Sequence, residues 1–180
     1  TFLAILILLS PIALSKTLNV VVGLERPPYV IQKTNSGYEL ELISQVITLM
    51  GYDVNYIYVP YGRSQKFLSE KDIDAITTMT LQTESRVEHL TDTYVTYYNS
   101  VITLADKNIN IRELNDLKNI PLVSFHNAKF LLGKEYHDAV SNNKNYIEIA
   151  EQRTQVKLLL KERVHCIVID KNIFNYFFKK

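Results

Sequence analysis

The sequence predicts an α/β fold of two lobes, each built on a mixed, mostly parallel sheet, with a hinge between them. Short apolar runs typical of buried strands alternate along the chain with segments of helical periodicity. Strands that alternate with helices form parallel sheets covered by those helices. The length of 180 residues suits one domain or two small lobes.

The first half of the chain predicts one long helix among several strands. The apolar run 18–22 is typical of a buried strand, and Gly23 ends it before the extended Pro27-Pro28 loop. Apolar residues then recur at helical spacing from Leu40 to Met50, and Gly51 stops that helix. Shorter patterns predict a helix at 63–68 and strands at 54–59, 73–76 and 97–104.

The second half continues the alternation. It predicts strands at 120–125, 146–149 and 164–169, and helices at 127–140, 151–161 and 171–178. The polar stretch that begins at Ala105 is a plausible crossing point. We therefore expect lobe one at 16–104, lobe two at 105–180, and a hinge near Thr103 to Asp106.

The N-terminal segment is expected to be a secretory signal peptide. Residues 2–14 are almost wholly apolar, but the run is shorter than the about 20 residues that span a bilayer. Small residues at Ala13 and Ser15 match a cleavage site, so we assign residues 1–15 to the signal peptide and expect a periplasmic mature protein. The chain starts with Thr1 and lacks a basic leader, so we expect further residues upstream. A buried helix or an uncleaved anchor is the alternative.

Composition excludes several function classes. The net charge of +1 gives no electrostatic footprint for nucleic acid or an anionic membrane. The single cysteine, Cys166, cannot form an internal disulfide, and we expect it to be a small residue of the hydrophobic core. The four histidines lack zinc spacing, and neither a nucleophile elbow nor a glycine-rich phosphate loop is present. We expect no enzyme, no metal and no cofactor.

Two oppositely charged residues at strand ends are the main candidates for ligand binding. Arg86 follows the strand-like run 73–76, and Asp170 closes the run 164–169. In α/β sheets, ligands bind beyond the carboxyl ends of the strands. A guanidinium holds a carboxylate through two parallel hydrogen bonds, and a carboxylate accepts from an ammonium group. The pair suits a zwitterion held between two lobes. The alternatives are a surface arginine and a helix-capping aspartate.

Five further residues lie at comparable strand ends or near helix starts. An aromatic ring after the Pro-Pro loop could form a floor for the ligand, and the backbone at a helix start attracts anions. Each also has a structural alternative, namely packing, a surface ion pair, helix capping or solvent exposure. These candidates are Tyr29, Glu25, Thr80, Asn127 and Arg63.

These stretches resemble one protein family. Pro27-Pro28-Tyr29 and the run Gly37 to Leu42 resemble the opening motif of type II periplasmic solute-binding proteins of the amino-acid (family 3) class. The stretch from Asp74 to Arg86 is similar to the family's "DaiiagmtiTpeR". Residues 116–118 and 163–170 resemble the start of its second lobe and its "GrvDavvvD" strand. The resemblance runs from about residue 18 to the end.

The resemblance implies a two-lobed clamp of the periplasmic-binding-protein-like II fold, a monomer that passes a small polar ligand to an ABC transporter permease. In amino-acid binders of the family, the positions matching Arg86 and Asp170 hold the ligand carboxylate and amino group. Tyr29 matches the aromatic residue of the opening motif, and Thr80 lies in a ligand-contacting stretch. In this chain, residues 124–128 replace the Gly-Thr anion loop of lobe two. The family's return to lobe one is missing, so we expect a C-terminally truncated chain.

Two other functions remain open from the sequence. The first is a ligand-sensing input domain of a membrane signalling protein with the same fold. The second is an accessory domain of a wall-cleaving enzyme, whose catalytic domain would follow Lys180. The downstream coding sequence would distinguish both from a transport receptor.

Overall fold

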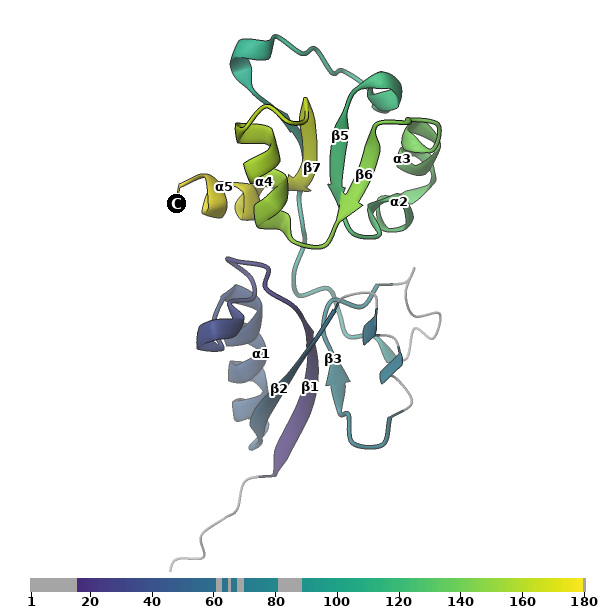
Figure 1. Ribbon diagram of the computed structural model, residues 1–180. Helices are drawn as coiled ribbons and strands as arrows, with labels where there is room; N and C mark the ends of the chain where they lie inside the picture. The colour runs from purple at the N-terminus through teal and green to yellow at the C-terminus, as the bar shows by residue number, and fades with distance from the viewer. Residues whose placement is uncertain (1–15, 61–62, 65, 68–69, 81–88, 180) are drawn as a thin grey trace, which may run out of the picture.

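The computed structural model describes residues 16–60, 63–64, 66–67, 70–80 and 89–179 (Figure 1). The signal peptide predicted at residues 1–15 lies outside these ranges, as does part of the helix predicted at 63–68. Among the described residues, none of the helices combines the length and the apolar character that a membrane crossing requires.

Lobe one is a parallel sheet with one long helix on its face. Strand β1 (Thr17–Gly23) lies between β2 (Asp53–Val59) and β3 (Ala75–Ile76), and both neighbours run parallel to it. Helix α1 (Tyr38–Leu49) covers the sheet (Figure 1). The run Val20–Val22 of β1 is buried because this strand lies at the centre of the sheet.

Lobe two is a four-stranded sheet with helices on both faces. The strand order is β4-β7-β5-β6, built from β4 (Asn99–Thr103), β7 (Cys166–Asp170), β5 (Leu122–Phe125) and β6 (Tyr146–Ile149). All pairs are parallel except β4 with β7. Helices α2 (Ala128–Leu131) and α3 (Gly133–Val140) cover one face, and α4 (Gln152–Leu160) and α5 (Lys171–Phe178) the other (Figure 1).

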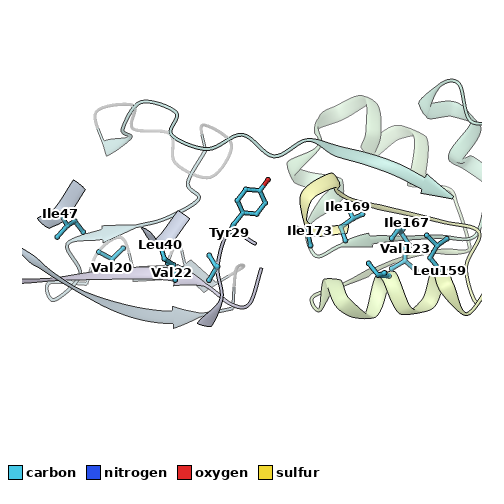
Figure 2. Packing of buried hydrophobic residues seen from close by; sticks show 12 residues of the cluster. Val20, Val22, Tyr29, Leu40, Ile47, Val123, Leu159, Ile167, Ile169 and Ile173 are labelled. Carbon is cyan, nitrogen blue, oxygen red and sulfur yellow. The ribbon is translucent and has the colours of Figure 1, made fainter. Parts of the chain in front are cut away.

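Side chains of β7 alternate between the two faces of the lobe-two sheet. Cys166 and Val168 pack in the cluster that includes Tyr136 of α3. Ile167 and Ile169 pack with residues of α4 and α5, as Figure 2 shows for Leu159 and Ile173. This alternation is the period of two that a strand imposes. The strand is buried on both sides, which explains its continuous apolar sequence.

The structure confirms the predicted fold class of two mixed, mostly parallel sheets. The predicted helix 127–140 is two helices, because the chain bends at Gly133, whose φ is +86°. The lobe boundary also differs from the expectation at 104/105. Residues 99–103 pair with β7 and therefore lie in the sheet of lobe two. We place the connection between the lobes before Asn99, not at Thr103 to Asp106.

Candidate functional site

The candidate site lies where the carboxyl ends of the strands in the two lobes face each other. Strands β1 and β3 of lobe one end toward lobe two, and β5, β6 and β7 end toward lobe one (Figure 1). Ligands of α/β sheets bind beyond such strand ends. Tyr29, which follows β1, points from lobe one toward lobe two (Figure 2).

Asp170 is buried at this junction, and its carboxylate accepts hydrogen bonds from both lobes. Its side chain is 2% exposed. Oδ1 accepts hydrogen bonds from the backbone N–H groups of Asn172 at 2.8 Å and Ile173 at 3.1 Å, which caps α5. Oδ2 accepts from the Tyr98 N–H at 2.8 Å. The capping role is therefore present in this structure.

Tyr29 connects lobe one to that carboxylate. Its hydroxyl donates to Asp170 Oδ1 at 3.2 Å and accepts from Asn172 Nδ2 at 2.9 Å. Its ring meets Tyr97 edge-on at a centroid distance of 4.7 Å. Burial is the largest cause that raises the pKa of the Tyr29 hydroxyl, and the neighbouring Asp170 charge adds to it. The hydroxyl therefore remains a donor at neutral pH.

The turn that carries Tyr29 is held against the start of α1. The Pro28 carbonyl oxygen accepts the Tyr38 N–H at 3.1 Å, and the Tyr29 carbonyl oxygen accepts the Glu39 N–H at 3.1 Å. Both N–H groups lie in the first helical turn and have no acceptor within the helix. Gly37 permits this close approach, because a Cβ there would lie 2.4 Å from the Tyr29 carbonyl oxygen. Its φ of +114° also favours glycine. The opening motif thus fixes Tyr29 and Glu39 side by side.

Glu39 is the centre of a buried polar network in lobe one. Its side chain is fully buried and forms an ion pair with Arg26, whose Nη2 lies 2.8 Å from Oε2. Oε2 also accepts from the Tyr97 hydroxyl at 3.1 Å. Oε1 accepts from the hydroxyls of Tyr94 at 2.8 Å and Thr78 at 3.0 Å. Four donors satisfy this carboxylate, as a buried charge requires.

The same network fixes the segment that leads into lobe two. Tyr94 and Tyr97 precede β4, so their hydroxyls anchor the interlobe connection to α1. Burial raises the pKa of the Tyr97 hydroxyl; the Arg26 charge opposes this shift and the Glu39 charge adds to it. Thr78, which follows β3, has a left-handed φ of +60°, a strained conformation for a β-branched residue. Such strain is typical of functional sites.

The remaining predicted residues have varied positions. Glu25 is exposed, and its carboxylate accepts the Gln32 N–H at 2.9 Å. Arg63 is exposed and Thr80 is half-buried after β3. Arg86 lies outside the described residues. The structure thus brings Tyr29 and Asp170 together.

The backbone at Asn127, which was expected to attract a ligand anion, is already occupied. The Asn127 N–H donates to Glu148 Oε2 at 2.8 Å, and the Lys129 N–H donates to Oε1 at 2.9 Å. The Asn127 side chain makes no capping hydrogen bond, and its φ is +65°. An internal carboxylate therefore takes the place predicted for the ligand.

The sequence did not point to several residues of the site. An acidic residue in the first turn of an amphipathic helix usually faces solvent, so Glu39 gave no signal of burial. Arg26, which follows Glu25 in the sequence, pairs with the distant Glu39. Pattern reasoning also left out Tyr94, Tyr97, Asn172 and Glu148. Across the described ranges, no group of three or more His, Cys, Asp or Glu residues is placed to hold a metal ion.

Comparison with known proteins gives one family and one fold. The sequence pattern of the bacterial extracellular solute-binding proteins, family 3, matches residues 18–173. No curated protein sequence matches the chain.

Three solved structures illustrate the likeness in fold. An ABC uptake transporter substrate-binding protein from Streptococcus pneumoniae with bound histidine has TM-score 0.71 and 16% identity, over 91% of this chain and 69% of that one. A histidine kinase sensor domain with similarity to periplasmic binding proteins has TM-score 0.72 and 17% identity, over 92% and 72%. The ancestral amino acid-binding protein AncCDT-1, a precursor of cyclohexadienyl dehydratase, has TM-score 0.71 and 16% identity, over 91% and 74%. At these identities the likeness shows the fold alone.

Proposed function

This chain belongs to family 3 of the bacterial extracellular solute-binding proteins, and from that premise we propose that it captures a small polar ligand between its two lobes for uptake by an ABC transporter. The observation that carries the proposal is the direct contact across the lobes between Tyr29 and Asp170. This contact lies at the carboxyl ends of the strands, where α/β folds bind ligands.

We propose that the ligand is an amino acid or a related compound. Several of the similar structures are amino-acid binders, such as the protein from Streptococcus pneumoniae with bound histidine. Asp170 Oδ1 accepts the Tyr29 hydroxyl, so a ligand ammonium bound there would replace a neutral donor with a charged and stronger one. Arg86 is proposed to hold the ligand carboxylate.

Proteins of this family act outside the cytoplasm. The signal peptide, the compartment, the oligomeric state and the protein partner of this chain are proposals. We propose that residues 1–15 are a cleaved signal peptide, that the mature chain is a periplasmic monomer, and that its protein partner is an ABC transporter permease. We also propose binding without catalysis of its own. A sensing domain shares this fold with the histidine kinase sensor domain, and that likeness favours neither function.

A thermal-shift screen with amino acids, polyamines and small organic acids tests the proposal. A ligand at about 100 times its dissociation constant should stabilise the protein by about 2.7 kcal/mol. The variant Arg86→Ala should abolish the shift, and Arg163→Ala, which removes an exposed arginine of lobe two, should keep it. An unchanged shift in Arg86→Ala would remove Arg86 from the site, and a screen without any hit would count against the binding function.

A further inference from the structure

We propose that Glu148 makes the lobe-two side of the candidate site selective against acidic ligand groups. The inference rests on the proposed binding function. It narrows the ligand class, because the group of the ligand that lies against the turn between β5 and α2 must be neutral or cationic. Glu148 need not touch the ligand. It acts by occupying the backbone donors that an acidic group would otherwise use.

The geometry around Glu148 is that of a filled anion site. Both of its oxygens are engaged: Oε2 with the Asn127 N–H at 2.8 Å, and Oε1 with the Lys129 N–H at 2.9 Å. The Tyr146 hydroxyl donates to Oε1 at 2.7 Å. Backbone N–H groups that converge on a turn form a concavity for anions. In this protein a side chain of the protein supplies the anion.

The position of Glu148 at the strand ends follows from the sheet register. Glu148 pairs with Ser124, one residue before the end of β5 at Phe125, and β6 ends at Ile149. The turn at Asn127, with its φ of +65°, follows at once and aims its N–H groups back at β6. Tyr146 and Glu148 share one face of β6 because they are two residues apart. The carboxylate thus lies at the edge of the lobe-two sheet that faces lobe one.

An incoming carboxylate at this edge would meet a negative charge and would find the N–H groups of Asn127 and Lys129 already occupied. Asp170, the last residue of β7, places a second carboxylate at the same edge. The Lys129 ammonium lies 4.6 Å from the centroid of the Tyr146 ring. The two backbone N–H groups stay occupied by Glu148. Like charges in a partly desolvated site repel, so acidic ligand groups are disfavoured.

The test compares matched neutral and acidic probes, glutamine with glutamate and asparagine with aspartate, by titration calorimetry. The intact protein should bind the neutral member more tightly by about tenfold or more, and Glu148→Gln should reduce that preference by about fivefold or more. Glu135→Gln removes the same charge from an exposed position on α3 and should leave the preference unchanged. A role in folding alone would not move the ratio of the two affinities.

Two results would overturn the proposal: an equal preference in Glu148→Gln and Glu135→Gln, or tighter binding of the acidic probe by the intact protein. If no probe binds the intact protein, the proposed binding function is wrong. Amide hydrogen exchange then tests separately whether the Glu148 carboxylate occupies the turn. In Glu148→Gln the amides of Asn127 and Lys129 should then exchange about tenfold faster relative to the rest of lobe two. Unchanged exchange at both amides would show that the carboxylate does not occupy the turn.

Discussion

The Tyr29 hydroxyl donates a hydrogen bond to Asp170 Oδ1 at 3.2 Å and thereby joins the two lobes through residues that lie 141 positions apart in sequence. The hydroxyl accepts a second bond from Asn172 of lobe two. Because Tyr29 is held by the first turn of α1 and Asp170 caps α5, the contact couples the helices of both lobes. A change in lobe orientation must break or remake it.

Tyr29→Phe should weaken the contact between the lobes while it keeps the ring in place. Loss of the hydroxyl removes two hydrogen bonds, and each contributes about 1 kcal/mol at most sites. We expect a larger radius of gyration in small-angle scattering of the ligand-free protein and a lower free energy of unfolding. Tyr38→Phe is the control, because that side chain is 66% exposed. Equal scattering curves for both variants would mean that Tyr29 does not hold the lobes together.

Asp170→Ala should destabilise the protein even without ligand. The carboxylate caps α5 and accepts the Tyr98 N–H, so its removal leaves the buried Ile173 N–H and the partly buried Tyr98 N–H without this acceptor. Loss of a helix cap costs about 1 kcal/mol, and each unsatisfied buried donor adds about 1 to 3 kcal/mol. Urea unfolding of the ligand-free protein measures the sum. Unchanged stability would indicate that Asp170 serves ligand binding and not the fold.

Local patterns in the sequence predicted much of the fold. The strand expected at 146–149 is β6, and the apolar run 18–22 is the core of β1. A buried parallel strand such as β1 has a continuous apolar run, so it can be recognised from a single sequence. The strand at 99–103 was predicted but assigned to lobe one, because the sequence of a strand does not indicate which sheet it joins. Its partner, β7, lies far along the chain.

The candidate site was less accessible from the sequence because it depends on contacts between distant segments. Asp170 and Tyr29 were selected from their positions at strand ends, and the structure brings them together. Burial of Glu39 depends on Arg26 and on tyrosines more than fifty residues away, as the separations of 55 and 58 positions show. Neither a motif nor a periodicity marks such a set. Its recognition required the packing of α1 against the interlobe connection.

Glu39→Ala should unfold lobe one far more readily than a surface substitution. Without the carboxylate, the buried Arg26–Glu39 ion pair is lost, and breaking such a pair costs about 3 to 5 kcal/mol. Urea titration followed by circular dichroism gives the free energy of unfolding. Glu135→Ala, on the exposed face of α3, should change it by less than about 0.5 kcal/mol. Similar values for the two variants would contradict a structural role of the Glu39 network.

Gly37→Ala should disturb the turn that carries Tyr29. The new Cβ would lie 2.4 Å from the Tyr29 carbonyl oxygen, closer than any real contact, and the φ of +114° is unfavourable for alanine. Gly51→Ala is a matched control, because its φ of +83° is also positive but its Cβ would meet no atom within 4 Å. Strained backbone costs about 1 to 3 kcal/mol, so the excess loss in Gly37→Ala measures the clash. A smaller loss in thermal stability for Gly37→Ala than for Gly51→Ala would rule out the close approach.

Alkaline pH should destabilise the protein through its buried tyrosines. Burial raises the pKa of Tyr56 to about 12, and its hydroxyl donates to the Leu40 carbonyl at 2.6 Å. Burial also raises the pKa of Tyr97. An unfolded tyrosine has a pKa of about 10, so above that pH the unfolded chain releases protons that the folded protein keeps. The stabilising contribution is complete below pH 10 and is lost as the pH rises through the folded pKa values.

The free energy of unfolding should therefore fall steadily from pH 10 to pH 12, and phenolate absorbance should rise together with the loss of structure. Tyr56→Phe removes one of the groups responsible and should reduce the slope over that range, while Tyr38→Phe, at an exposed position, should not. A stability that stays constant to pH 12, with every tyrosine titrating near its ordinary value, would show that the phenols are open to solvent. Such a result would also remove the tyrosine anchors from the Glu39 network.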